Sequence, residues 1–175
     1  MAEDSTAPLA VTHSDTLQGY LEMWKQTVTV QQHFNEICWK IRGLALTVLT
    51  FTLGAASLTA RHENQPPPIK FWQYDVDSAV VILAVGILIW LAFFFVDASW
   101  YHKLLKASVD HGASLERELQ RYLPEAGLTD RISAGSASRL WPTKITLRST
   151  HKLQLFYGII AAFLAALAAV LQFGS

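Results

Sequence analysis

Three long stretches without charged residues constrain the fold of this 175-residue chain more than any other feature. They are residues 43–60, 78–96 and 153–173. A helix rises ~1.5 Å per residue and the hydrocarbon core of a bilayer is ~30 Å thick, so each stretch can cross it. Unpaired backbone groups are costly in lipid, so each crossing segment must be a helix. The sequence predicts an all-α integral membrane protein with three transmembrane helices.

The composition also indicates a membrane protein. Charged residues make up 16% of the chain and hydrophobic residues 51%, whereas an average soluble domain carries about 25% charged residues. Three apolar helices buried inside a soluble protein would need a much larger amphipathic shell than this chain offers. Lys and Arg together number 14 and so do Asp and Glu, which argues against a general nucleic-acid-binding domain. A single cysteine excludes an intramolecular disulfide framework.

The positive charges predict an orientation. The segment 97–152 contains nine Lys and Arg residues, whereas the loop 61–77 contains only Arg61 and Lys70. Because positive loops stay in the cytoplasm, segments 1–42 and 97–152 are predicted inside and the loop 61–77 outside. The N-terminus is then in and the C-terminus out. The acidic, polar first residues are not those of a cleavable signal peptide.

Two of the spans are predicted to continue into the cytoplasm. Apolar residues recur at helical spacing over 15–42, which indicates an amphipathic helix that begins at Ser14 or Asp15 and flows into the first span. Its polar face is poor in lysine, which favours packing against a partner helix over lying on the membrane surface. After the second span, the segment 97–152 is predicted as a helix followed by a basic linker. The stripe of this helix comprises Trp100, Leu104, Leu115, Leu119 and Tyr122.

The first span carries small and hydroxylated residues on one helical face. They are Thr47, Thr50, Gly54 and Ser57, spaced i, i+3, i+7 and i+10. Such a face can line a water-filled path if several copies surround an axis, but it can equally serve close packing between helices. Three helices cannot enclose a pore, so a channel requires a symmetric homo-oligomer, such as a tetramer.

Ionisable residues are absent from the interior of the spans, which argues against an ion-coupled carrier. The nearest such residue is Asp97, at the cytoplasmic end of the second span, with Trp100 and His102 after it. These residues are candidates for a gate or pore mouth; the alternative is anchoring at the membrane interface.

The cytoplasmic segment offers candidates for binding an anionic ligand. Between 131 and 152 there are five Lys and Arg residues and no acid. Phosphate groups of lipids or nucleotides are the ligands that such a segment attracts, although positive cytoplasmic loops need no ligand to explain them. On the preceding helix, Glu116 and Glu118 could hold the arginines in ion pairs. The candidates are Arg131, Arg139, Lys144 and Arg148, with Arg117 and Arg121 on the preceding helix and Trp141 as a base-stacking surface.

Motifs of enzymes are not found. The six histidines are scattered, Cys38 lies on the apolar stripe, and no metalloprotease, hydrolase or phosphate-loop motif occurs. The sequence therefore predicts a protein that is not an enzyme and that needs no cofactor or metal.

Two stretches resemble a known group. QQHFNEICWKIRGLALTVLTFTLGA (31–55) and FFFVDASWYHKLLKASVDHGASLE (93–116) are similar to small bacterial membrane effectors of anti-phage defence. These include Hailong-type transmembrane effectors and related two-span effectors associated with a nucleotidyltransferase. The resemblance implies an oligomeric channel in the bacterial inner membrane, gated by a nucleotide or short oligonucleotide from that partner, whose opening depolarises the cell. The third span departs from the two-span arrangement.

The sequence thus leaves two main hypotheses. The first is a homo-oligomeric channel effector. The second is a non-conducting membrane scaffold or accessory subunit that recruits a soluble cytoplasmic partner. A lipid-modifying enzyme is a remote third, because the spans lack catalytic carboxylates and histidines.

Overall fold

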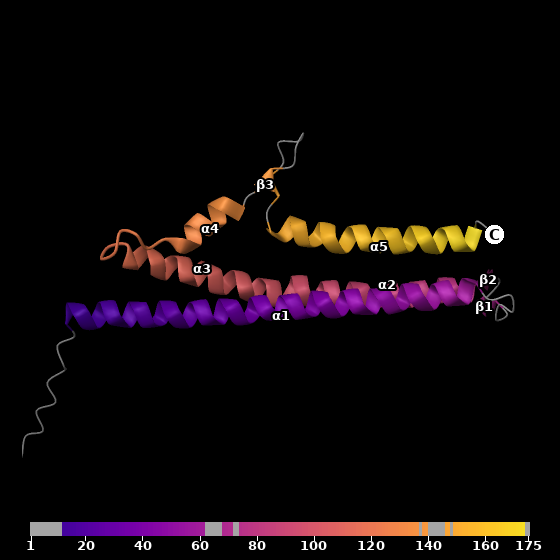
Figure 1. Ribbon diagram of the computed structural model, residues 1–175, viewed down its shortest axis with the longest axis horizontal. Helices are drawn as coiled ribbons and strands as arrows, with labels where there is room; N and C mark the ends of the chain where they lie inside the picture. Colours follow the sequence, from indigo (N-terminus) through magenta and orange to yellow (C-terminus); the bar gives the residue numbers. More distant parts are fainter. Residues whose placement is uncertain are drawn as a thin grey trace, which may run out of the picture. The chain divides into compact units, whose positions relative to one another are not determined.

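The computed structural model describes residues 12–61, 68–71, 74–136, 138–139, 146–147 and 149–173 (Figure 1). Helices dominate these residues, in agreement with the predicted all-α class, and the short strands lie in the connections. In chain order the elements are α1 (His13–Arg61), β1 (Ile69–Phe71), β2 (Tyr74–Val76), α2 (Ser78–Val96), the π-helix η1 (Asp97–Tyr101), α3 (His102–Leu119), α4 (Leu128–Ser136), β3 (Ser138–Arg139), β4 (Thr146–Leu147) and α5 (Ser149–Phe173).

Three of the helical segments are long and apolar enough to cross a membrane. They contain the predicted spans 43–60, 78–96 and 153–173, and α2 has the bounds predicted for the second span. Asp77 caps α2 because its side chain accepts a hydrogen bond from the backbone N–H of Ala79, at 2.7 Å. The prediction of three membrane-spanning helices is therefore confirmed at the level of length and composition.

Helix α1 is continuous from the amphipathic segment into the first span, as predicted. Its N-cap differs from the prediction, since Thr12 rather than Ser14 or Asp15 precedes the first turn. The hydroxyl of Thr12 accepts from the N–H of Asp15 at 3.3 Å, and the Asp15 carboxylate accepts from the N–H of Thr12 at 3.1 Å. This reciprocal pair forms a capping box, and the hydrogen bonds from Thr12 lower the pKa of the Asp15 carboxyl.

The chain divides into two compact units. The first, here called the helical unit, comprises residues 12–33 and 106–136 of the described chain. The second, the span unit, comprises residues 34–105 together with the described residues from 138 onward.

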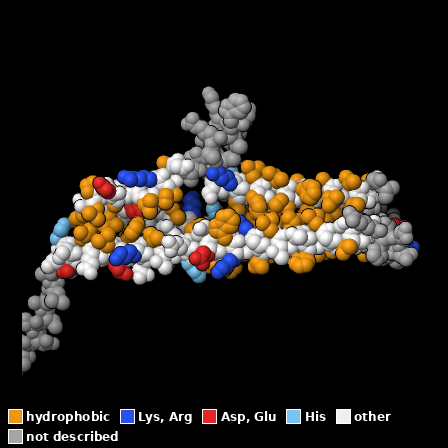
Figure 2. Space-filling view, viewed as in Figure 1, with side chains coloured by type: hydrophobic (Ala, Val, Ile, Leu, Met, Phe, Trp, Pro, Cys, Tyr) orange, Lys and Arg blue, Asp and Glu red, His pale blue; other side chains and the backbone are white. Residues whose placement is uncertain are grey.

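In the span unit, small residues of α1 face large residues of α2 and α5. One core cluster joins Ala45 to Trp90, Leu153 and Tyr157. The other, further along the helices, contains Ala56, Ala79, Leu83 and Leu164. The outer surface is apolar as well, and hydrophobic side chains cover most of the right-hand half of the face in Figure 2. Large apolar side chains exposed on the span unit include Phe51, Leu88 and Phe163.

The predicted outer loop 61–77 contains a short hairpin in its described part. Strands β1 and β2 pair antiparallel, with Ile69 opposite Val76. Gln172, near the end of α5, donates to the carbonyl of Asp75 at 3.1 Å and accepts from the N–H of Asp77 at 3.4 Å. These bonds join the end of α5 to the start of α2.

In the helical unit, α3 packs antiparallel to the first half of α1. The side chain of Gln31 donates to the carbonyl of Ser108 at 3.0 Å, and the rings of His13 and Tyr122 lie 4.8 Å apart. Trp100 and Leu104, which belong to the span unit, are exposed. The buried stripe runs at helical spacing and comprises Gly112, Leu115, Glu116 and Leu119.

Candidate functional site

A buried ion pair joins α1 to the junction of α2 and η1. Arg42 Nε donates to Asp97 Oδ2 at 2.7 Å, and Arg42 Nη2 donates to Asp97 Oδ1 at 3.3 Å. The side chain of Asp97 is 0% exposed and that of Arg42 is 25% exposed. Two donors on two carboxylate oxygens make a fork that fixes both distance and orientation.

The third helix of the span unit joins the same carboxylate. The Tyr157 hydroxyl, from α5, donates to Asp97 Oδ2 at 3.2 Å. The Trp90 indole N–H donates to the backbone carbonyl of Tyr157 at 2.9 Å, and the two rings lie 4.9 Å apart. Cys38, which the sequence placed in the core, is 1% exposed. All three helices of this unit therefore converge on one polar cluster, which comprises Arg42, Asp97 and Tyr157.

Local sequence explains why these groups meet. Arg42 directly precedes the apolar run of α1, and Asp97 directly follows the apolar run of α2. Antiparallel helices bring those two ends to one level. At Asp97 the backbone widens into the π-helix η1, which is a local insertion often found at functional positions.

The contacts of this cluster suit a structural role. Removing two charges from water is costly, and only close pairing with further hydrogen bonds offsets that cost. Both carboxylate oxygens of Asp97 are occupied by donors, so they are committed to contacts within the chain. The cluster can hold three helices in one arrangement, and losing one partner would leave a buried charge.

The pairing of Arg42 with Asp97 was not predicted from the sequence. The available signal was two opposite charges at the same end of two spans that must run antiparallel. Of the predicted pore-mouth residues, Asp97 is buried whereas Trp100 is 61% exposed. His102 lies near them in the chain and is half-buried.

The predicted pore face lies on the surface of the single chain. Thr47, Thr50, Gly54 and Ser57 are all exposed, and a Cβ added at Gly54 would meet no neighbouring atom within 4 Å. The hydroxyls of Thr47 and Thr50 each donate to a carbonyl four residues earlier, at 3.0 Å. The structure thus keeps these four residues on one outward face that packs against neither α2 nor α5.

The predicted ligand-binding residues are only partly described. Arg131 on α4 and Arg117 and Arg121 near the end of α3 are exposed, and Arg121 forms an ion pair with Glu118 at 2.9 Å. Arg139 belongs to β3 and its side chain is outside the described residues. Trp141, Lys144 and Arg148 also lie outside the described residues.

Glu116 does not pair with an arginine as expected. It is 4% exposed, and it accepts from the Trp24 indole N–H at 3.0 Å. Thr129, at the start of α4, donates its backbone N–H at 2.8 Å and its hydroxyl at 3.0 Å to the same carboxylate. Glu116 therefore fastens α1, α3 and α4 together in the helical unit.

Beside Glu116 lies a half-open cavity of about 370 Å³. Its lining is mostly aliphatic, and Leu123 and Leu128 at its rim are exposed. No group of three His, Cys, Asp or Glu residues suited to a metal ion occurs in the described part of the chain.

Comparison of the chain with protein-family models, with curated proteins and with solved structures found no match.

Proposed function

We propose that the protein is a homo-oligomeric membrane channel, the effector of an anti-phage defence system. A nucleotide or short oligonucleotide made by a partner nucleotidyltransferase gates it, and its opening depolarises the membrane. It lies in the bacterial inner membrane with the N-terminus inside and the C-terminus outside. The protein acts without enzymatic activity of its own.

The observation that carries this proposal is the outward face of Thr47, Thr50, Gly54 and Ser57. Around it, α1 exposes large apolar side chains such as Phe51, which is 75% exposed, and Leu58, which is 68% exposed. A face of hydroxyls and bare backbone among such residues suits a water-filled path or a helix of a second copy better than lipid. Symmetric assembly would bring copies of this face together around one axis.

The cluster of Arg42, Asp97 and Tyr157 supports a membrane module with one defined packing. The defence role and the nucleotide signal depend on the resemblance of residues 31–55 and 93–116 to such effectors. The exposed basic residues Arg117, Arg121 and Arg131 are the described candidates for sensing the signal.

The test combines mass determination in detergent with ion flux from liposomes. We expect a symmetric oligomer that leaks ions, with leakage altered by short oligonucleotides. Thr50→Trp and Ser57→Trp should each abolish the flux, because an indole on the pore face fills the path while the exposed position leaves intrachain packing intact. Leu88→Trp, on α2 and also exposed, is the matched control and should conduct. Unchanged flux through assembled Thr50→Trp and Ser57→Trp variants would refute the pore face.

The second candidate is a non-conducting scaffold that recruits a soluble partner. The helical unit favours it, because Leu123, Leu128 and Ile132 are exposed apolar residues on or beside its cavity. A monomer or dimer that stays tight to ions under every nucleotide tested would favour this function over the channel.

A further inference from the structure

Exposed tryptophans and lysines gather at one level of the span unit. Trp39 is 66% exposed and Trp100 is 61% exposed, and the nearby lysines are exposed as well. We call the set the headgroup belt; its members are Trp39, Lys40, Trp100, Lys103 and Lys152.

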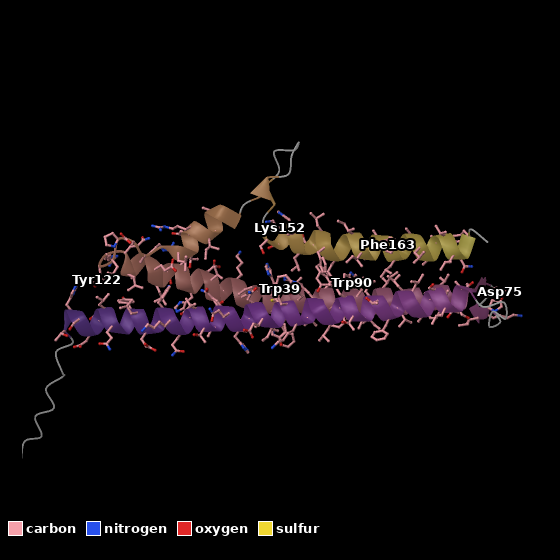
Figure 3. The ribbon with its side chains drawn as sticks, viewed as in Figure 1. Trp39, Asp75, Trp90, Tyr122, Lys152 and Phe163 are labelled. Carbon is pink, nitrogen blue, oxygen red and sulfur yellow. The ribbon has the colours of Figure 1, made fainter. Side chains whose placement is uncertain are left out.

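The ion pair between Arg42 and Asp97 shows that two of the helices share this level. Trp39 lies three residues before Arg42, and Trp100 lies three residues after Asp97. Since α1 and α2 run in opposite directions, both steps lead away from the apolar part of the bundle by about 4 to 5 Å. On α5, Lys152 directly precedes the core residue Leu153, and Figure 3 shows Trp39 and Lys152 at the same level along the unit.

The surface charge at this level is positive. The segments 36–42, 97–103 and 149–157 are fully described and contain two acids, Glu36 and Asp97. Asp97 is buried against Arg42, so its charge is compensated inside the bundle. The surface then carries three lysines against the single carboxylate of Glu36. In Figure 2, Lys and Arg side chains (blue) lie near the middle of the view, beside the hydrophobic surface (orange) of the right-hand half.

The two residue types suit a lipid boundary. An exposed tryptophan places its ring at the junction of headgroup and acyl chain. A lysine extends its aliphatic stem along apolar surface and presents its ammonium to the phosphates. The opposite end of the unit lacks this combination in its described part, where the exposed Lys70 is accompanied by Asp75.

We propose that the headgroup belt binds the phosphodiester headgroups of anionic lipids, such as phosphatidylglycerol, at the end of the bundle where Arg42 and Asp97 pair. The three lysines lie on three different helices. The lipids therefore surround the bundle instead of entering a pocket. The site is independent of ion conduction.

The test titrates the purified full-length protein in uncharged detergent with phosphatidylglycerol or phosphatidylcholine and counts retained lipids by native mass spectrometry. The wild type should retain phosphatidylglycerol preferentially. The variant K40Q/K103Q/K152Q should bind it roughly 10- to 100-fold more weakly. The control K25Q/K70Q removes exposed positive charges elsewhere and should bind like the wild type.

A second variant, K40R/K103R/K152R, keeps the charges and should retain phosphatidylglycerol, which separates loss of binding from loss of folding. Equal retention of phosphatidylglycerol by the glutamine variant and the wild type would overturn the proposal. So would equal retention of the two lipids by the wild type. Displacement of the lipid by excess inorganic phosphate would also overturn it, because it would indicate a site for free phosphate.

Discussion

The span unit and the helical unit differ in the residues that they expose. The span unit buries alanines such as Ala45 together with large side chains such as Trp90 and Leu83, and it exposes large apolar side chains such as Phe51. The helical unit buries Leu115 and Leu119 and exposes charged residues of the same helix. Burial of apolar area drives packing in water, but it gives little advantage in lipid, where close approach of small residues takes its place.

The two units also neutralise a buried carboxylate differently. Asp97 in the span unit is paired with a full positive charge. Glu116 in the helical unit is surrounded by neutral donors, from Trp24 and Thr129. A buried carboxylate in this chain is therefore stabilised in two ways, by a counter-ion at Asp97 and by hydrogen bonds at the start of a helix at Glu116.

The largest effect should come from breaking the pair in the span unit. Asp97→Leu leaves the half-buried Arg42 guanidinium without its partner, and we expect a loss of about 3 kcal/mol in the free energy of unfolding. Denaturant titration in mixed micelles measures it. The double variant R42L/D97L should recover most of the loss, because no uncompensated charge remains. Glu36→Leu, at an exposed acid, is the control. Simple additivity of the two single losses would contradict the pairing.

A smaller and local effect should follow Glu116→Gln. The amide keeps the shape of the side chain but loses the charge that faces the start of α4, so we expect a loss of about 1 to 3 kcal/mol. Hydrogen exchange should rise in residues 13–33 and 106–136 and stay unchanged in α2 and α5. Glu118→Gln on the same helix is the control. Increased exchange across both units would show that Glu116 and Asp97 do not stabilise the two units independently.

The smallest effect should come from the contact between α1 and α2. A Cβ at Gly86 would collide with the Thr52 side chain, closest at Cγ2. Gly86→Ala should therefore cost about 1 to 2 kcal/mol, measured by the same denaturant titration. Thr52→Ser removes that methyl group and should restore stability in the double variant. Gly158→Ala, where a Cβ meets nothing within 4 Å, should not destabilise.

Hydropathy alone predicted the three candidate spans, because an uncharged run of this length has few other uses. The continuation of α1 and of α2 through η1 into α3 was also predictable from apolar spacing. The cap at Thr12 was missed, since several neighbouring residues can accept the same hydrogen bonds and only the backbone decides among them.

The contacts between distant segments could not be read from spacing. Arg42 and Asp97 are 55 positions apart, and each has an ordinary explanation at the end of a span. Glu116 and Glu118 looked equivalent beside Arg117 and Arg121, but only Glu118 pairs with an arginine because Glu116 lies on the buried stripe. Thr47, Thr50, Gly54 and Ser57 are all exposed, and their role as a pore face stays a prediction. The partner of this face in the assembly remains a proposal.

The bonds of Gln172 have a consequence for bilayer thickness. The span unit is fastened at one end by Arg42, Asp97 and Tyr157 and at the other by the bonds of Gln172 to Asp75 and Asp77. The 20 residue-to-residue steps from Asp77 to Asp97 rise about 30 Å. Helices fastened at both ends cannot shorten by sliding past one another, so in a thinner bilayer the unit must tilt or deform the lipid around it. A change in the acyl-chain length of the lipids would therefore change the tilt of all three helices together.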